Sequence, residues 1–400
     1  MGAMRRGVYE KIAKQLYSHT KARTTDSTGV IKEVPVANYR DRERWEKEVK
    51  QIFQGMPLLV ALTCELKNPF DFKALEISGI PLLITRGEDR IVRTFLNVCR
   101  HRGAHVVEPG HGNRSRFTCP YHSWTYDQTG RLVRITDQEK FGQTKLEQRS
   151  LVELYTEEKA GLIFTCLTPE YTFNLEAFLG EMLDELSAFE LESWTLASQN
   201  VIEGPNWKIA VDGYIEFYHI ASLHHETLGS MITNNVMACE TFGNYTFGPH
   251  QRIAAPSSDI LKRLNKPAKE WETGEAMIDV KFLFPNNSFA ITSGNSLSPS
   301  GGMLSQVLPG TSPESSITIQ NHIYQDLPEN GPQREAINAA IERFKYVVRE
   351  EDYRGGRQIQ LGMNTEANSC FTFGENEVGP QNFHTALDYF LQEPLERRRF

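Results

Sequence analysis

Two short motifs in the first third of the chain each combine a cysteine with a histidine. The first is Cys99-Arg-His101, and the second, separated from it by seventeen residues, is Cys119-Pro-Tyr-His122. Each motif offers one thiolate and one imidazole, and both groups bind transition metals. Four such ligands from two loops are enough to complete one metal centre. The spacing therefore predicts that Cys99, His101, Cys119 and His122 bind a common metal group.

The mixed composition of these motifs separates two kinds of metal site. Structural zinc sites usually pair like ligands, as C-x-x-C and H-x3–5-H. In a Rieske 2Fe–2S cluster, two cysteines hold one iron and two histidines hold the other, which raises the reduction potential. Loops that each supply one ligand of both types favour the Rieske cluster, and Trp124 and Tyr126 lie near enough to shield it. A structural zinc site is the alternative.

A second group of acidic and histidine residues lies just past the middle of the chain. Asp212, Glu216 and His219 follow at intervals of four and three residues, so they would share one face of a helix. His224 comes five residues after His219, about 140° further round an ideal helix. The two histidines can bind one metal only if the helix ends or unwinds after His219. His225 could be the second histidine ligand in place of His224, or it could orient a ligand without binding the metal.

A third ligand is expected from the helix predicted over 333–352, whose apolar residues recur at intervals of three and four. Asp352 continues this apolar stripe, and an acid in such a position should not be buried without a partner. A metal would supply the partner, whereas in the alternative the helix simply ends and the carboxylate reaches water. Together His219, His224 and Asp352 would form a 2-His-1-carboxylate site, which holds non-haem Fe(II) and leaves positions open for O2.

The surrounding pattern predicts two kinds of domain. Residues from about 55 to 155 contain two hairpins, 81–98 and 123–133, and are typical of a small antiparallel β domain with both Cys/His motifs in tight loops or at strand ends. After residue 160 helices stand beside a run of strands, which predicts an α+β fold. The predicted helices cover 206–223 and 333–352, and the predicted strands cover 280–284, 288–292 and 316–319.

Size and charge exclude several classes of protein. The chain has 400 residues, enough for two or three domains, and a formal charge of −8, which disfavours binding to nucleic acid or to anionic membranes. No apolar run approaches the ~20 residues that cross a bilayer. No signal-peptide segment opens the chain, so we expect a cytoplasmic protein. No G-x-G-x-x-G fingerprint of a flavin or nicotinamide site is present, so the electrons must come from another protein.

These motifs together resemble the Rieske non-haem iron aromatic-ring-hydroxylating oxygenases, specifically their large α subunits. The C-x-H-x17-C-x2-H pair and the Asn206-Trp-Lys…Glu-x-x-His-x4-His segment stand in the family's order and spacing, and residues 351–362 resemble its Glu-Asp…Gln-x-Gly pattern. The resemblance implies a Rieske domain beside a helix-grip (START-like) catalytic domain, in which an antiparallel sheet wraps a long helix. It also implies one 2Fe–2S cluster and one Fe(II) in each subunit.

The resemblance also implies domain ranges and an assembly. An N-terminal arm over 1–40 would pack on the catalytic domain, the Rieske domain would cover 41–160, and the catalytic domain would cover 161–400. The expected assembly is a ring-shaped homotrimer or an α3β3 hexamer.

Two positions depart from the family pattern. In the family, an acidic residue three positions before the first histidine ligand bridges to a cluster histidine of the neighbouring subunit. That residue here is Glu216, where most relatives carry Asp. Ser123 is the second departure, because Gly usually follows the Cys-Pro-Tyr-His segment. Asp212 is expected to help as a hydrogen-bond acceptor that orients the histidine ligands.

The implied function is that of a terminal oxygenase, which uses O2 and electrons from an external ferredoxin or reductase. The expected reaction is mono- or cis-dihydroxylation of a hydrophobic, aromatic small molecule, because the apolar content after residue 200 suits such a substrate. N- or O-demethylation is the alternative within the family. An electron carrier, or a zinc-stabilised binding protein without oxygenase activity, is the alternative from another class.

Overall fold

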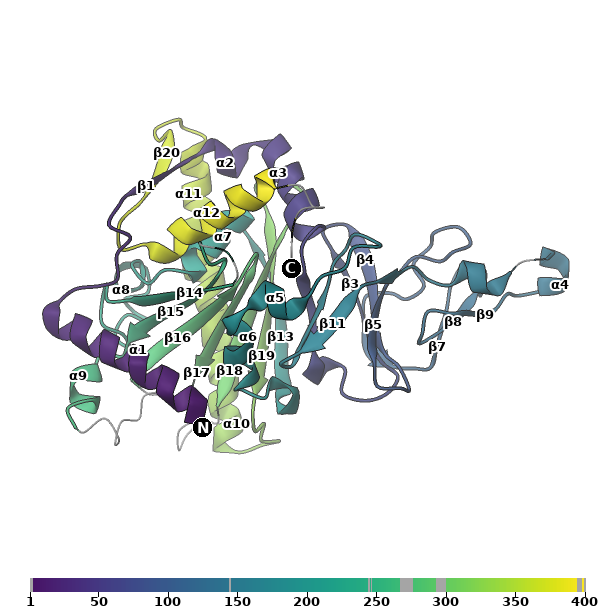
Figure 1. The fold of residues 1–400 in the computed structure, drawn as a ribbon, viewed down its shortest axis with the longest axis horizontal. Helices are drawn as coiled ribbons and strands as arrows, with labels where there is room; N and C mark the ends of the chain where they lie inside the picture. Colours follow the sequence, from purple (N-terminus) through teal and green to yellow (C-terminus); the bar gives the residue numbers. More distant parts are fainter. Residues whose placement is uncertain are drawn as a thin grey trace. The chain divides into compact units, whose positions relative to one another are not determined.

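The chain divides into two compact units, whose elements can be followed in Figure 1. The first unit consists of residues 3–49, 179–189 and 194–393, and the second of residues 50–178, 190–193 and 398. The computed structural model describes residues 3–143, 145–243, 245, 247–266, 276–292, 300–393 and 398.

The second unit, which carries the Cys/His motifs, is built from three small antiparallel sheets. A five-stranded sheet has the order β10-β5-β4-β3-β6, and two three-stranded sheets have the orders β11-β12-β2 and β7-β8-β9. Both predicted hairpins are confirmed, as β4 with β5 and β8 with β9. The strands are β2 (Leu58–Leu62), β3 (Asp71–Ile77), β4 (Ile80–Arg86), β5 (Val92–Leu96), β6 (Gly110–Asn113), β7 (Arg116–Thr118), β8 (Thr125–Asp127), β9 (Leu132–Arg134), β10 (Glu153–Leu154), β11 (Thr156–Lys159) and β12 (Leu162–Thr165); the short helices are α4 (Gln138–Phe141) and α5 (Leu175–Leu179).

The first unit is centred on one seven-stranded antiparallel sheet with the order β13-β19-β18-β17-β16-β15-β14. The three strands predicted after residue 280 fall on β16, β17 and β19, so the α+β class is confirmed. The strands are β13 (Thr195–Gly204), β14 (Ala238–Phe242), β15 (His250–Pro256), β16 (Met277–Leu283), β17 (Asn287–Thr292), β18 (Gly301–Pro309) and β19 (Ser316–Tyr324). A separate two-stranded sheet pairs β1 (Lys32–Pro35) with β20 (Cys370–Phe373).

Helices cover both faces of this sheet. On one face the aromatic ring of Phe383 in α12 packs against Phe282 and Phe284, so the long helix α12 lies against this face of the sheet. On the other face α1 lies against β15, and the hydroxyl of Tyr9 donates a hydrogen bond to buried Asp279 at 2.6 Å (Figure 1, α1 in purple). The helices are α1 (Ala3–Ala22), α2 (Ala37–Arg40), α3 (Arg42–Glu48), α6 (Glu181–Ser187), α7 (Trp207–Tyr214), α8 (Ile220–Leu223), α9 (Ile260–Arg263), α10 (Pro332–Tyr346), α11 (Tyr353–Met363) and α12 (Val378–Gln392).

The main segment of the second unit covers 50–178, so its limits lie 9 and 18 residues beyond the predicted boundaries at 41 and 160. Helix α3 belongs to the first unit, because its buried Glu48 accepts a hydrogen bond from the indole of Trp207 in α7 at 3.0 Å. Strand β12 belongs to the second unit, because it pairs with β2. No helix in the described part of the chain is long and apolar enough to cross a membrane.

The prediction of one continuous helix over 206–223 is wrong, because the helix is interrupted. Helix α7 ends at Tyr214, and α8 begins only at Ile220. Between them the carboxylate of Glu216 accepts hydrogen bonds from the backbone N–H groups of Tyr218 and His219. A side chain that binds nearby backbone donors competes with helical hydrogen bonding. The break therefore falls before His219, and the histidines flank a new short helix.

The helix predicted over 333–352 continues further than expected. Helix α10 ends at Tyr346 and passes through a wider π-helical turn, Val347–Asp352, into α11. Such turns shift the side chains that follow them and are frequent at functional sites. Here the turn ends on Asp352.

Candidate metal centres

The two Cys/His motifs form tight loops within the second unit. Cys99 follows β5, and its carbonyl accepts a hydrogen bond from the N–H of Gly103 at 2.9 Å. Cys119 lies between β7 and β8, and its carbonyl accepts from the N–H of Ser123 at 3.0 Å. Both cysteines are buried in one cluster with Phe117 and other apolar residues. The loops are short, so the ligand spacing in the sequence becomes proximity in the fold.

The donor atoms of these loops fit an iron–sulfur cluster. The imidazole rings of His101 and His122 lie with their centroids 4.7 Å apart, and the indole of Trp124 stacks on His101 at 4.9 Å. Among the described residues, buried Nδ1 of His101 has no hydrogen-bond partner, so it is available to bind iron. Burial raises the pKa of the Cys119 thiol, and a bound metal would hold that sulfur as the thiolate. Two sulfurs and two imidazoles are the Rieske ligand set.

The hydroxyl of Tyr126 lies beside the predicted cluster ligand Cys99. Its hydroxyl accepts a hydrogen bond from the N–H of Arg100 at 3.0 Å and lies 3.4 Å from Sγ of Cys99. Because the hydroxyl oxygen already accepts from the backbone, its proton can be donated to the sulfur. Hydrogen bonds to cluster sulfurs are one of the means by which a protein sets the reduction potential.

Ser123 explains one departure from the family pattern. Its φ is +57°, in the left-handed region that favours glycine. Glycine reaches this conformation without strain, whereas serine adopts it here at some cost in backbone strain.

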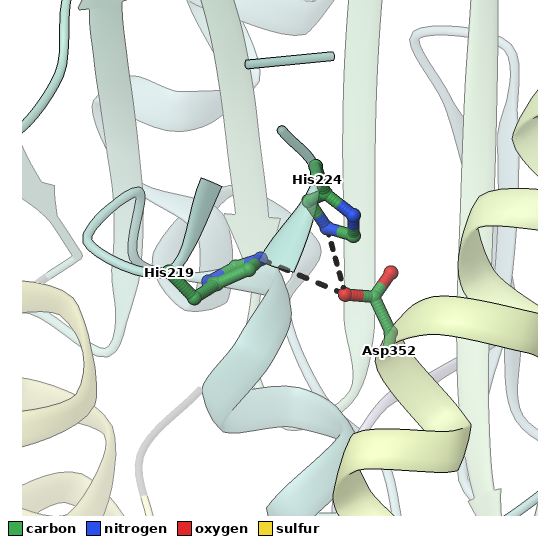
Figure 2. Close-up of side chains that lie close together, drawn as sticks. All are labelled: His219, His224 and Asp352. Atoms are coloured by element: carbon green, nitrogen blue, oxygen red, sulfur yellow. Dashed lines mark ion pairs between the residues drawn. The ribbon is translucent and has the colours of Figure 1, made fainter. Parts of the chain in front are cut away.

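The second group of predicted ligands also converges. Atoms of His219, His224 and Asp352 that could bind one metal ion all lie within 4.8 Å of one another. Oδ1 of Asp352 lies 2.9 Å from Nε2 of His224 and 3.6 Å from Nε2 of His219, and Figure 2 shows both rings turned toward it. His219 immediately precedes α8 and His224 immediately follows it. The chain between them stays helical, with the N–H of His224 donating to the carbonyl of Ile220 at 3.0 Å, so the predicted unwinding after His219 does not occur. The two rings instead approach Asp352 from the two ends of this short helix. The donor set of two imidazoles and one carboxylate is the one expected for non-haem iron.

Two further carboxylates hold the imidazoles from behind. Glu216 contacts Nδ1 of His219, and Oε2 of Glu351 lies 2.6 Å from Nδ1 of His224. Each carboxylate fixes its ring so that Nε2 faces the metal position. Burial lowers the pKa of both imidazoles, but these carboxylates and Asp352 outweigh it and raise the pKa above the ordinary value. The site thus favours a positive charge, which a metal ion would supply.

Asp212 lies elsewhere than predicted. Its carboxylate accepts a hydrogen bond from the hydroxyl of Tyr39 at 2.7 Å and lies 3.0 Å from Nε2 of His384. Because α7 ends at Tyr214, the helical face that would have aligned Asp212 with His219 does not exist. Glu216 and Glu351 take the orienting role instead. Glu351 was not predicted to orient a ligand, although its position next to Asp352 in the sequence was a signal for that role.

His225 lies outside the group of three ligands. Its side chain is 65% exposed, and Nδ1 lies 3.1 Å from the carbonyl oxygen of Ser222. This geometry leaves His224, which is almost fully buried, as the second imidazole of the site.

A cavity of about 370 Å³ opens beside the ligands. Asp352 and His219 form part of its wall, together with the carboxylates of Asp212, Glu216 and Glu377. Burial and the two neighbouring carboxylates, Glu216 and Asp212, raise the pKa of Glu377. No lysine or arginine lines this cavity among the described residues. The wall is therefore acidic and would attract positively charged groups.

Family models match both parts of the chain. The model of the ring-hydroxylating alpha subunit (catalytic domain) matches residues 191–393, just over half of the chain, and the Rieske [2Fe-2S] domain model matches residues 56–154. The chain belongs to the ring-hydroxylating alpha subunit family. It is a Rieske oxygenase, an oxidoreductase with a 2Fe–2S cluster and a non-haem iron, whose electrons come from a reductase or ferredoxin. The predicted family, enzyme class and cofactors are confirmed.

Curated relatives of this Rieske oxygenase include monooxygenases and a dioxygenase. It is 29% identical over 368 residues to the carnitine monooxygenase oxygenase subunit of Escherichia coli (strain K12), covering 88% of this chain and 92% of the relative. It is 30% identical over 200 residues to the glycine betaine monooxygenase oxygenase subunit of Chromohalobacter salexigens, covering 50% and 44%. It is 35% identical over 195 residues to the 2-aminobenzenesulfonate 2,3-dioxygenase subunit alpha of Alcaligenes sp, covering 46% and 49%.

Solved structures share the fold of this Rieske oxygenase. A quaternary ammonium Rieske monooxygenase in complex with L-carnitine matches with a TM-score of 0.75 at 23% identity, covering 90% of this chain and 96% of that one. A naphthalene 1,2-dioxygenase bound to phenanthrene matches with a TM-score of 0.71 at 19% identity, covering 92% and 94%. At these identities the similarity establishes the architecture alone.

Proposed function

We propose that this chain is the terminal component of a monooxygenase system whose substrate is a polar, N-methylated ammonium compound. The observation that carries the oxygenase part is the convergence of His219, His224 and Asp352 in a chain that also carries a Rieske ligand set. Iron bound by these three residues would supply O2 activation. In the overall reaction, O2 with two electrons and two protons places one oxygen atom in the substrate and releases the other as water.

The relatives favour the ammonium substrate over an arene. One relative, which covers 88% of this chain, is a carnitine monooxygenase subunit, and another is a glycine betaine monooxygenase subunit; both compounds carry a trimethylammonium group. Oxidation of a carbon bonded to that nitrogen would break the C–N bond and yield an amine and a carbonyl compound. The aromatic substrate, predicted from the apolar content after residue 200, stays a prediction, and Phe371 and Phe373 in the cavity wall are compatible with it.

A substrate panel tests this proposal. The purified holoenzyme, supplied with a surrogate reductase, would be incubated with L-carnitine, glycine betaine, naphthalene and 2-aminobenzenesulfonate. We expect an ammonium compound to yield an amine and a carbonyl compound, with one oxygen atom of 18O2 in the carbonyl compound. Turnover of an arene to a diol that contains two 18O atoms, without turnover of either ammonium compound, would instead establish a dioxygenase.

We also propose that the subunits assemble as a homotrimer, with or without a β subunit, and pass electrons between copies. Tyr121, His122 and Arg102 lie at the cluster end of the second unit, where Tyr121 is 58% exposed and the Arg102 guanidinium lies 3.0 Å from Nε2 of His122. The acidic cavity around Glu216 has the complementary charge. A similar quaternary ammonium Rieske monooxygenase is described with inter-subunit electron transfer. In this proposal His122 of one copy faces Glu216 of the next, in a cytoplasmic enzyme.

A further inference from the structure

The β7-β8-β9 sheet of the second unit, labelled in Figure 1, turns one face toward the cluster ligands. Phe117, Tyr126 and Leu132 pair across the three strands and are buried in the same apolar group as Cys99 and Cys119. The hydroxyl of Tyr126 lies 3.4 Å from Sγ of Cys99, and Cys119 directly follows β7 in the chain. The cysteine ligands therefore lie against the buried face of this sheet.

The opposite face of the same sheet is exposed and carries arginines. Successive residues of a strand point to opposite faces, so Arg116, next to the buried Phe117, belongs to the outer face of β7. On β9, a register shift between Thr125 and Tyr126 places Arg134 opposite Thr125, on the same outer face. Both arginines are exposed. One layer of strands thus separates a basic surface from the cysteine ligands.

The positive charge of this outer face is only partly neutralised. Arg131, in the turn between β8 and β9, lies 3.2 Å from the carboxylate of Asp127, and Arg116 lies 3.7 Å from it. Asp127 is only 5% exposed, so its carboxylate adds little negative surface. Arg134 forms no ion pair with any residue that the structure describes. Three arginines share one acid, which leaves the outer face positive.

This basic surface belongs to a chain that is acidic as a whole. Residues 100–134 contain six arginines and two acidic residues, whereas the whole chain has 43 basic and 51 acidic residues. Beyond β9 the signs are mixed again, and Asp137 there pairs with Lys140 at 3.4 Å. A local basic surface attracts negatively charged partners and speeds their encounter.

Reduction of the cluster requires such a partner. This Rieske oxygenase takes its electrons from a reductase or ferredoxin. Electron transfer between proteins slows steeply with the distance between their redox centres, so a donor should dock where little protein covers the cluster. The β7-β8-β9 sheet meets this requirement, because its buried face contacts the ligands and its outer face is open to solvent.

We propose that Arg116, Arg131 and Arg134 form the docking surface for an acidic one-electron donor protein, which reduces the cluster from its cysteine side. One electron leaves the metal centre of the donor, which is oxidised, and enters the cluster, which is reduced; no bond forms or breaks. The inference goes beyond the proposed function, because it concerns where electrons enter the chain and does not depend on the substrate.

Reduction of the cluster by two reductants of different charge tests the proposal. The purified holoenzyme, without substrate, would be mixed rapidly with a reduced acidic plant-type 2Fe–2S ferredoxin or with the small cation of reduced methyl viologen. Ferredoxins of this type have potentials of about −400 mV, low enough to reduce a Rieske cluster. The EPR signal of the reduced Rieske cluster, followed by freezing the mixture at successive times, gives the second-order rate constant.

The variants should respond differently to the two reductants. With ferredoxin, Arg134→Glu and Arg116→Gln should lower the rate constant about tenfold and about threefold at an ionic strength of about 0.01 M. Both effects should nearly vanish at about 1 M, where the Debye length is only about 3 Å. With methyl viologen the rate constant should stay the same or rise, because the face becomes less positive. Damage to the cluster would instead slow both reactions.

Lys14→Glu is the matched control for net charge. Lys14 is exposed on α1 in the first unit, and its reversal changes the charge of the chain as much as Arg134→Glu does. The control should change the rate constant with ferredoxin by less than about twofold, because the altered charge lies outside the docking surface.

Four outcomes would overturn the docking surface. These are reduction by methyl viologen but not by ferredoxin, no slowing in either arginine variant, equal slowing in K14E, or equal slowing with both reductants. The results also separate this inference from the proposed function, because cluster reduction is measured without substrate. Turnover of an arene alone would contradict the ammonium substrate and leave the docking surface intact, whereas unaltered reduction of R134E and R116Q would do the reverse.

Discussion

Both metal centres depend on residues that position the ligands. At the cluster, Tyr126 places its hydroxyl beside Sγ of Cys99. At the iron site, Glu216 and Glu351 each hold one imidazole by its Nδ1 atom. None of these three residues is a ligand, yet each determines how a ligand atom is oriented or charged.

The role of Glu351 can be tested by Glu351→Gln. The amide can still accept a hydrogen bond from His224 but brings no charge, so the imidazole becomes a weaker ligand. We expect the affinity for iron to fall about 10- to 100-fold, as for other residues that support metal ligands, while the cluster stays intact. Iron competition against a chelator measures this. Glu350→Gln is the matched control, because the exposed Glu350 pairs only with Arg349 among the described residues. Equal iron affinity in E351Q and the wild type would contradict the role.

The role of Tyr126 can be tested by Tyr126→Phe. Without the hydroxyl, Sγ of Cys99 loses its nearest hydrogen-bond donor and the reduced cluster, which carries the extra negative charge, is less stable. The reduction potential should therefore fall by several tens of millivolts. Redox titration followed by EPR measures the change, and an unaltered potential would show that the 3.4 Å contact does not affect the cluster.

At the scale of elements, a buried ion pair joins α3 near the N-terminus to α7, the helix that precedes the iron site. Glu48 at the end of α3 binds Nζ of Lys208 in α7 at 2.5 Å, and both side chains are almost completely buried. Arg44 adds a third contact to Glu48 at 3.0 Å. Burial lowers the pKa of Lys208, and Glu48 opposes that effect. Helix α7, which precedes the iron ligands in the chain, is thus anchored through Lys208 by Glu48, 160 positions earlier in the sequence.

Glu48→Gln should destabilise the first unit strongly. The substitution leaves the buried Lys208 ammonium without a countercharge, which typically costs about 3–5 kcal/mol. Urea denaturation of the holoenzyme measures the loss. Glu43→Gln on the exposed side of the same helix should change stability by less than about 0.5 kcal/mol. A similar effect of both variants would show that the pair contributes nothing specific.

His322 on β19 should make the stability of the sheet depend on pH. Burial lowers its pKa from 6.5 to about 4, so the folded protein keeps the imidazole neutral while the unfolded chain protonates near pH 6.5. This contribution is fully present above pH 6.5 and is lost as the pH falls toward 4, by up to about 3 kcal/mol. His322→Gln should reduce the pH dependence of the free energy of unfolding between pH 6.5 and 5. Identical pH slopes in the two proteins would contradict the prediction.

At the scale of the whole molecule, the proposed trimer makes a prediction about mixed assemblies. One variant lacks the cluster through Cys119→Ser, and the other lacks the iron site through Asp352→Ala. Each alone should be inactive. If each iron receives electrons only from a neighbouring copy, random equal mixing during co-expression should restore about a quarter of wild-type activity, because half of the copies keep iron and half of their neighbours keep the cluster.

The mixed assembly has a control and a contradicting outcome. Mixing the two variants after separate purification, under conditions where subunits do not exchange, should restore nothing. If co-expressed variants form mixed assemblies and still lack activity, the electron passes within one chain and the bridge from His122 to Glu216 is excluded.

Much of the cluster site could be predicted from the sequence, because each motif occupies one tight loop. Cys99 and His101, and likewise Cys119 and His122, are so close along the chain that no packing can separate them. The strands after residue 280 and the family likewise follow from local pattern. The iron site depended on more: His219 and Asp352 are 133 positions apart in the chain, and tertiary packing brings Nε2 of one to 3.6 Å from Oδ1 of the other.

The tertiary structure alone decided the rest. In the folded chain the helix ends at Tyr214, and Asp212 contacts Tyr39 and His384 instead of an iron ligand. Glu351 contacts His224 and orients it. The physical reason is the same in each case. Residue types and local spacing determine which ligands a loop can offer, whereas burial, register and the partner of each buried polar atom depend on segments that are distant in the chain.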